Sequence, residues 1–195
     1  MILEAIVTTR NADGTTNVAP MGPSCPDPSF RAFELRPFRS SNTWKNLRRN
    51  GQGVLHITDD VLVFARSATR ADWQANLQPA SQIDGECLSD CCRCYEFETT
   101  WMDDTQSRAV VHCKTLSSHR FRDFFGFNRA KHAVIEACIL ATRIDFLPAT
   151  QIQNQMFDLQ KMVAKTGGEQ ERMAFALLEN FFMENGVIPT QGPAQ

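Results

Sequence analysis

Basic and hydroxyl side chains gather where a helix over residues 41–50 is expected to begin. No acidic residue occurs between Glu34 and Asp59, although the chain of 195 residues has a formal net charge of −2. The side chains that could bind an anion there are Arg36, Arg39, Ser40, Ser41 and Thr43. Guanidinium groups supply charge and a planar fork of donors, and the start of a helix favours negative charge. The pattern therefore suggests a phosphate site.

An ordinary N-cap explains the same residues without a ligand. Ser40 or Ser41 would then cap the helix, and the arginines would form a solvated face. N-cap serines are common, so the residue types alone favour this simpler interpretation. Arg49, two turns beyond Arg39, is expected to face solvent in either case.

The strand-like run "TNVAPMGP" has an interrupted pattern. Pro20 lacks a donor for a sheet ladder, and Gly22 allows close approach of another group, which is typical of an edge or bulged strand. An edge strand beside Met21 could meet the polar rim of a flat heterocycle, although a plain edge strand needs no ligand. Together with a phosphate site, it would fit a mononucleotide with a planar head.

A second basic helix start follows Gly126. Arg129, Lys131 and His132 all fall in the first turn of a helix expected from Asn128, where the dipole disfavours cations unless an anion is near. They could be a surface helix end, or a second arm of the same anion site contributed across a dimer interface.

The cysteines and histidines do not form a recognisable catalytic or metal motif. Cys91 and Cys94 have C-x-x-C spacing, but a second pair is absent, so we expect ordinary thiols and no metal. His56 lies in an apolar run and is expected to be a core residue. The chain has neither a Walker motif nor G-x-G-x-x-G.

The order of the expected elements places strands before helices. Strands are expected at 2–10, 15–21, 30–35, 53–58, 95–102 and 108–116, and helices at 41–50, 128–144, around 152–163 and at 169–184. Residues 61–66 are expected to form a helical turn and residues 77–85 a loop. This order predicts an α+β protein built on an antiparallel barrel or sheet.

Composition limits the class of protein further. A content of 43% hydrophobic and 22% charged residues is ordinary for a soluble globular chain, and no apolar run is long enough for a membrane helix. The start shows no signal-peptide features, so we expect a cytoplasmic protein whose seven cysteines are reduced. The near-neutral charge makes nucleic-acid binding unlikely.

Three blocks of the sequence resemble the DUF447 family. They are "MILEAIVTTRNADGTTNVAPMGP", "RPFRSSNTWKNLRRNGQGVLHITDDVLVFAR" and "NRAKHAVIEACILATRIDFLP". The resemblance implies an FMN-binding split β-barrel, a fold shared with flavin reductases and pyridoxamine-phosphate oxidases. It would divide the chain into a barrel at 1–126, a helical annex packed on the barrel at 127–188, and a flexible tail at 189–195. The cysteine run from Cys87 to Cys94 is not a feature of that family.

The resemblance also implies a cofactor and the residues that hold it. The phosphate would lie on Arg39, Ser40, Ser41 and Thr43, with Asn46 behind them; the ring would lie against Ala19, Pro20, Met21 and Gly22; and Arg36, Pro37 and Phe38 would join the two parts. Arg129 and His132 are candidates for the second arm described above. Two protomers would form a homodimer with FMN at their interface.

The resulting hypothesis is an FMN-dependent oxidoreductase of the flavin reductase kind, with NAD(P)H as a possible electron donor. A non-catalytic FMN carrier or storage protein is the alternative. A nucleic-acid-binding domain that uses the basic segment 36–49 ranks last, because Trp44 is the only aromatic residue of that helix.

Overall fold

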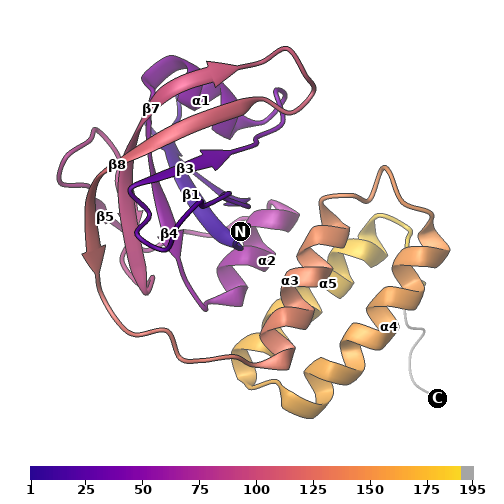
Figure 1. Ribbon diagram of the computed structural model, residues 1–195. Helices are drawn as coiled ribbons and strands as arrows, with labels where there is room; N and C mark the ends of the chain where they lie inside the picture. Colours follow the sequence, from indigo (N-terminus) through magenta and orange to yellow (C-terminus); the bar gives the residue numbers. More distant parts are fainter. Residues whose placement is uncertain (190–195) are drawn as a thin grey trace. The chain divides into compact units, whose positions relative to one another are not determined.

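A computed structural model describes residues 1–189 of the chain (Figure 1). The chain divides into two compact units that are interleaved in sequence. The first unit contains Met1–Asp59 and Gln74–Phe124, and the second contains Asp60–Trp73 and the chain from Phe125 onward. Whether the helical segment packs on the barrel stays a prediction, and residues 190–195 of the expected tail lie outside the described part.

The first unit is built on a six-stranded antiparallel sheet. Its strands are, in sequence order, β1 (Ala5–Arg10), β2 (Thr16–Met21), β3 (Ala32–Leu35), β4 (Gln52–Ile57), β7 (Arg93–Asp103) and β8 (Val110–Arg120). Their order in the sheet is β2-β1-β4-β7-β8-β3. The edge position expected for the strand with Pro20 is therefore confirmed, since β2 is an outer strand.

Ser24 links the two sides of this sheet. Its backbone forms bridges to Ile2, ahead of β1, and to Glu34 in β3. The Ser24 N–H donates to the Glu34 carbonyl over 2.8 Å, and the Glu34 N–H donates back over 2.9 Å. The sheet therefore curls and closes at one end, which confirms the split β-barrel expected for this α+β chain.

The inner face of the barrel is apolar and is covered by α1 (Asn42–Asn50). Trp44 and Leu47 of this helix join Val7, Leu55 and Phe97 in one buried cluster. Side chains alternate along β1 and β4, so the other face carries Ile6, Thr8 and His56. Gly51 ends α1 in the left-handed conformation, with φ of 65°, as expected for the residue that stops this helix.

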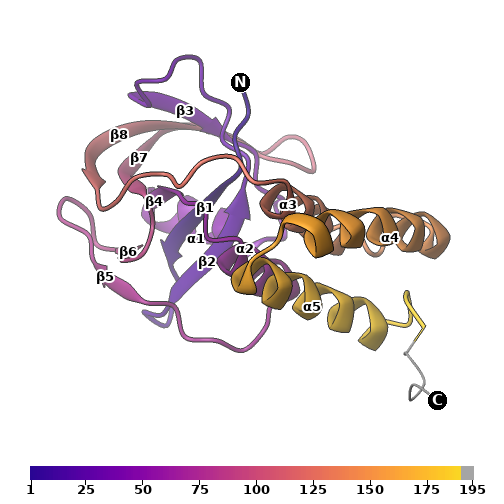
Figure 2. The same cartoon turned by 90° about the horizontal axis from the view of Figure 1, so that it is seen from below.

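Two short strands, β5 (Leu77–Pro79) and β6 (Glu86–Leu88), form a hairpin where a loop was expected. β6 lies beside β1 and β4 (Figure 2). The hairpin is held mainly by polar contacts: the Thr8 hydroxyl donates to the Glu86 carbonyl, and the Leu88 N–H donates to His56. Such contacts leave no apolar periodicity, which explains why the sequence pattern missed the strands.

The second unit is helical. Its members are α2 (Val61–Thr69), α3 (Arg129–Ala141), α4 (Ala149–Thr166) and α5 (Glu169–Glu184). α2 begins where the helical turn was expected and runs three residues beyond it. Asp60 caps its start, accepting from the N–H groups of Leu62 and Val63.

Small residues bring α3 close to its neighbours in that unit. The alanines at 130, 133, 137 and 141 are all buried, as their spacing predicts. A Cβ atom on Gly167, just after α4, would come within 2.6 Å of the Val163 carbonyl and 3.4 Å of the Ala130 Cβ, so no larger residue fits there. Across residues 1–189, every helix is too short or too polar to span a bilayer.

Candidate functional site

The start of α1 is capped as the simpler interpretation of the sequence predicts. Ser41 precedes the helix in an extended conformation, and its Oγ accepts from the Trp44 N–H over 3.2 Å. The same hydroxyl donates to the Phe38 carbonyl over 2.7 Å, so its proton is already used within the turn. The N–H groups of Asn42 and Thr43 belong to the first turn of the helix, so no carbonyl of the helix can accept from them. The cap shapes the turn, where Asn42 is exposed and Thr43 is buried.

The arginines before the helix differ in what they contact. Arg36 forms an ion pair with Glu34, since its Nε lies 2.6 Å from the Glu34 carboxylate. Within residues 1–189, neither the Arg39 guanidinium nor the Ser40 hydroxyl forms a hydrogen bond or an ion pair, and both residues are exposed. No acidic residue lies in the first turn of α1. Arg39 and Ser40 are therefore the groups with donors left for an anion.

Thr43 and Asn46 face inward and tie α1 to the sheet. Both are almost fully buried. Asn17 of β2 donates to the Thr43 Oγ1 over 3.2 Å, while Asn46 donates to Thr9 over 3.0 Å and to Asn11 over 2.8 Å. These amides fix the position of the helix start against β1 and β2; that Asn46 supports a phosphate site stays a prediction.

Arg49 does not simply face solvent. The residue is exposed, but its guanidinium donates to the Arg10 carbonyl and to the Asn46 Oδ1, the latter over 3.0 Å. The expectation that Arg49 is exposed is confirmed, and the structure adds these hydrogen bonds, since one helical turn separates Arg49 from Asn46 and brings both against the end of β1.

The residues proposed to meet a ring lie on the edge strand. Ala19, Pro20 and Met21 pair with Val7, Ile6 and Ala5 of β1 and are half-buried, and Gly22 follows them in an exposed position. Their other flank has no neighbouring strand in the sheet order. Their contact with a ring stays a prediction.

Pro37 and Phe38 connect this region to residues 107–109, just ahead of β8. Here the structure adds residues that the sequence pattern missed. The Ala109 N–H donates to the Pro37 carbonyl over 3.0 Å, and the Arg39 N–H donates to the Ser107 carbonyl over 3.2 Å. The Arg108 guanidinium lies 4.0 Å from the centre of the Phe38 ring. No local signal connects these segments, which are about 70 residues apart in the chain.

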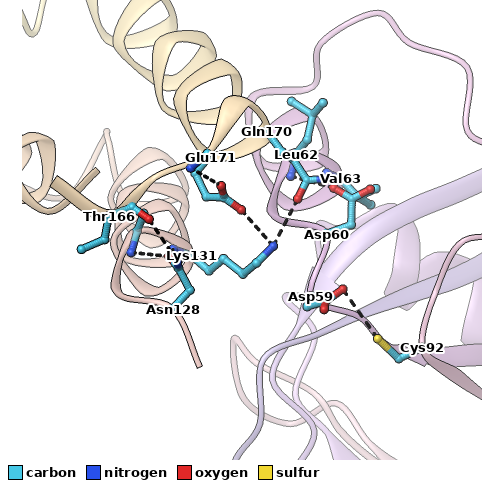
Figure 3. Close-up of polar contacts among 12 residues, drawn as sticks. Asp59, Asp60, Leu62, Val63, Cys92, Asn128, Lys131, Thr166, Gln170 and Glu171 are labelled. Atoms are coloured by element: carbon cyan, nitrogen blue, oxygen red, sulfur yellow. Dashed lines mark hydrogen bonds and ion pairs between the residues drawn. The ribbon is translucent and has the colours of Figure 1, made fainter. Parts of the chain in front are cut away.

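The start of α3 belongs to the other compact unit and is satisfied within it. Asn128 caps the helix by accepting from Ala130 and Lys131, and Lys131 Nζ lies 2.9 Å from Glu171 and 3.3 Å from Gln170 (Figure 3). The carboxylate that this basic start needs is therefore internal.

The two proposed residues of that start, Arg129 and His132, are exposed. The His132 ring stacks near the Phe127 ring, with 6.0 Å between centroids. A role for either residue in an anion site stays a prediction.

His56 is a satisfied core residue, as its apolar setting predicts. Its Nδ1 lies 3.1 Å from the Ile6 carbonyl, and its Nε2 accepts from the Leu88 N–H over 3.0 Å. This pattern requires the neutral ring. Burial lowers the pKa of His56 to about 4, although the bond to Ile6 works in the opposite direction.

The cysteines are buried thiols. None of the seven forms a disulfide, and burial raises the pKa of Cys94 to about 12 and also raises the pKa of Cys91 well above its ordinary value. Such thiols are poor nucleophiles, because the thiolate is the reactive form. Over residues 1–189, no cluster of three or more His, Cys, Asp or Glu side chains is suited to hold a metal ion.

Glu96 and His119 look superficially like parts of a hydrolytic triad. The buried Glu96 accepts from the N–H groups of Ser81 and Gln82, and these bonds lower its pKa despite the opposing effect of burial. His119 Nε2 lies 3.3 Å from Glu96 and 3.2 Å from the Ser81 hydroxyl. A triad needs the carboxylate and the hydroxyl on opposite ring nitrogens, so this cluster anchors the β5–β6 loop and is not a nucleophilic site.

The barrel, its link through Ser24 and the helix after β3 define a split-barrel protein of the kind found among flavin-binding proteins. The chain belongs to the DUF447 family. Residues 3–122 match the family model described as "Protein of unknown function (DUF447) N-terminal domain", and residues 128–180 match the model "Protein of unknown function (DUF447)".

Solved structures share the fold at low sequence identity. An FMN-bound DUF447 protein from Methanosarcina mazei is 21% identical, with a TM-score of 0.81 over 92% of this chain and 94% of that one. A 2-nitrobenzoate 2-nitroreductase from Pseudomonas fluorescens is 20% identical, with a TM-score of 0.50 over 60% and 64% of the two chains. The flavin reductase of styrene monooxygenase from Pseudomonas putida S12 is 10% identical, with a TM-score of 0.50 over 60% and 77%.

Proposed function

We propose that this protein binds FMN, with the phosphate at the start of α1. The observation that carries the proposal is the Arg39 guanidinium, which is exposed, has no carboxylate partner within residues 1–189, and precedes a helix without an acidic first turn. The FMN in the M. mazei relative supports the choice of ligand. The basic charge left over at this point is what a phosphate would neutralise.

The donor set fits a phosphate monoester. Arg39 offers a planar fork, Ser40 a free hydroxyl, and Asn42 a backbone N–H group at the start of the helix. Ser41 contributes by shaping the turn, since its own proton is bonded to Phe38. Thr43 and Asn46 hold the helix start from behind. Residues 19–22 of the open edge would face the ring.

The proposed activity is that of a flavin-dependent oxidoreductase, possible electron donors being NADH and NADPH. The bound flavin would supply the hydride or electron transfer, and the protein would bind it, orient it and tune it by hydrogen bonds. Neither Arg39 nor Ser40 is a general acid or base near neutral pH, which suits a reaction carried by the cofactor. An FMN carrier or storage protein would use the same site without turnover.

A homodimer is part of the proposal. Trp101 and Phe38, both on the barrel unit, are 52% and 42% exposed, and exposed aromatic side chains suit an interface. Sedimentation should give about twice the chain mass of 22.0 kDa. A monomer that still holds flavin would remove this part of the proposal. The seven cysteines form no disulfide, which fits the proposed cytoplasmic location.

Two measurements test the proposed function. The first is a titration of the purified protein with FMN and with riboflavin, followed by flavin fluorescence. We expect FMN to bind more tightly, because riboflavin lacks the phosphate, and equal affinities would contradict the site. The second is anaerobic addition of NADH or NADPH to the FMN-loaded protein. Bleaching of the flavin band supports the oxidoreductase, and an unchanged spectrum supports the carrier.

The salt dependence of binding distinguishes the oxidoreductase and the carrier, which both bind FMN, from the nucleic-acid alternative. Binding of a polyanion through Arg36, Arg39 and the basic residues of α1 should weaken steeply as salt rises, because each neutralised phosphate releases counterions. A single bound phosphate monoester should show a far smaller dependence.

A further inference from the structure

Arg108 lies beside the proposed phosphate turn but comes from a distant part of the chain. It lies two residues ahead of β8 (Val110–Arg120), and its backbone forms an isolated bridge with Phe38. The flanking residues Ser107 and Ala109 bond to the backbone of Arg39 and Pro37. The segment 107–109 therefore lines the whole turn from 37 to 39 and pairs with it as a short ladder.

The Arg108 side chain adds two contacts to that ladder. Its guanidinium carbon lies 4.0 Å from the centre of the Phe38 ring, which is within the range of a cation–π contact. Its Nη1 also donates to the Arg36 carbonyl, at a long 3.5 Å. The contacts fall on Phe38 and on the Arg36 carbonyl, in the segment that leads into Arg39. They therefore limit where the turn can present the Arg39 guanidinium.

Arg108 also adds charge where the turn already has an excess of it. Arg36 is paired with the Glu34 carboxylate, whereas neither Arg39 nor Arg108 has a carboxylate partner within the described residues. Stacking on a ring occupies the face of a guanidinium and leaves its in-plane donors directed outward. The turn thus holds two arginines whose charge is not balanced by the protein.

We infer that Arg108 is a positioning residue for the phosphate-binding turn, acting through Phe38 and the Arg36 carbonyl to fix Arg39. This inference rests on the proposed function. It makes a distinctive prediction, because a residue that acts on the phosphate turn changes the preference for FMN over riboflavin. A residue that only supports the fold would change both affinities together or neither.

The test compares the ratio of the riboflavin and FMN dissociation constants in four proteins: the wild type, Arg108→Ala, Arg108→Lys and Lys114→Ala. Arg108→Ala should weaken FMN binding by about tenfold and leave riboflavin binding unchanged, so the ratio falls about tenfold. Arg108→Lys keeps a cation over the ring and should recover part of the loss. Lys114, an exposed cation on β8 that lies 3.7 Å from Glu98, is the control and should keep the wild-type ratio.

A double variant tests the route of the effect. If Arg108 acts through Phe38, the loss from Arg108→Ala in a Phe38→Leu background should be clearly smaller than in the wild type. Equal losses in both backgrounds would overturn that route. Arg108→Gln, which keeps much of the stem, replaces the alanine variant if the latter unfolds.

The outcomes separate the inference from the function on which it rests. A wild-type protein that binds FMN and riboflavin equally contradicts the proposed phosphate site, and the role of Arg108 falls with it. A wild type that prefers FMN, together with an Arg108→Ala protein of unchanged ratio, contradicts the positioning role alone.

Discussion

Two helices of this protein begin with basic residues and no acidic ones, but their cations have different partners. At α3, Lys131 pairs with Glu171 inside the helical unit. At α1, Arg39 has no carboxylate partner among residues 1–189. The comparison teaches that a basic helix start indicates an anion site only where the fold has not supplied the anion itself. By this criterion α1 is the stronger candidate.

The largest expected effect tests the internal pair at α3. Glu171→Ala should lower the free energy of unfolding by about 3 kcal/mol, because it leaves the Lys131 ammonium largely buried without its carboxylate. The two side chains are only 16% and 9% exposed, so solvent screens the pair weakly. Urea denaturation followed by circular dichroism measures the change. Glu169→Ala, an exposed residue of the same first turn, is the control.

A second pair of variants sharpens that result. Replacing both partners by apolar residues, Lys131→Met with Glu171→Leu, should recover most of the lost stability. If the single variant Glu171→Ala costs less than about 0.5 kcal/mol, the pair is not what satisfies α3. Its cations would then be open to an external anion, as those of α1 are.

Acid should weaken the fold through the buried His56 of the barrel unit. The pKa of His56 is lowered from 6.5 to about 4, so below pH 6.5 the unfolded chain takes up a proton that the folded chain does not. Stability should therefore fall by about 3 kcal/mol between pH 6.5 and 4 and be unaffected by this residue above pH 6.5. The pKa of Glu96 is also lowered, so its contribution is lost only at the acid end of this range.

Denaturation midpoints measured across this pH range check the prediction. In His56→Gln the slope between pH 6.5 and 5 should be largely removed, whatever the overall stability of that variant. A wild-type protein whose stability is flat over the same interval would show that His56 is not held neutral.

A smaller effect is expected behind the α1 turn. Asn46→Ala removes the hydrogen bonds to Thr9, Asn11 and Arg49 that the buried amide forms, although the Thr9 hydroxyl keeps its bond from Asn17. The expected cost is about 2 kcal/mol of stability. Thermal unfolding measures it, and Asn42→Ala, exposed at the first position of the same helix, is the control. Equal melting temperatures for the two variants would contradict a supporting role for the buried amide.

Much of the α1 region could be predicted from sequence because its signals are local. The N-cap hydroxyl, the stop at Gly51 and the edge strand with Pro20 each depend on residues within a few positions of one another. Contacts between distant segments left no such signal. Arg108 reaches Phe38 only because the segment just ahead of β8 lies beside the turn, and Arg49 bonds to the end of β1 through the packing of α1.

The basic start of α3 is a case in which the local sequence signal suggested an anion site and a distant contact explains it instead. Its charge pattern resembles that of α1, and only the packing of α5 against α3 reveals that Glu171 lies beside Lys131. The hairpin β5–β6 was missed for a related reason, since buried polar contacts to β1 and β4 hold it rather than an apolar stripe.

The smallest expected effect concerns the outermost cation of α3. Arg129→Ala should change FMN affinity by less than about threefold and stability by less than about 0.5 kcal/mol, because the residue is exposed and the helix start is already capped and paired. Isothermal titration with FMN measures the affinity. A loss as large as that of Arg39→Ala would instead establish α3 as a second arm of the site.

The most direct test of the α1 site is the FMN dissociation constant of Arg39→Ala. A charge-assisted contact between this guanidinium and the phosphate is worth roughly 1.5–3 kcal/mol, so affinity should fall by about 10- to 150-fold, with Arg39→Lys recovering only part because it lacks the planar fork. Riboflavin binding should not change. Arg48→Ala, an exposed arginine in the last turn of α1, is the matched control and should bind FMN as the wild type does. If the folded Arg39→Ala and Arg48→Ala proteins bind FMN equally well, the arginine at the start of α1 is only a solvated side chain, and the site proposed here is wrong.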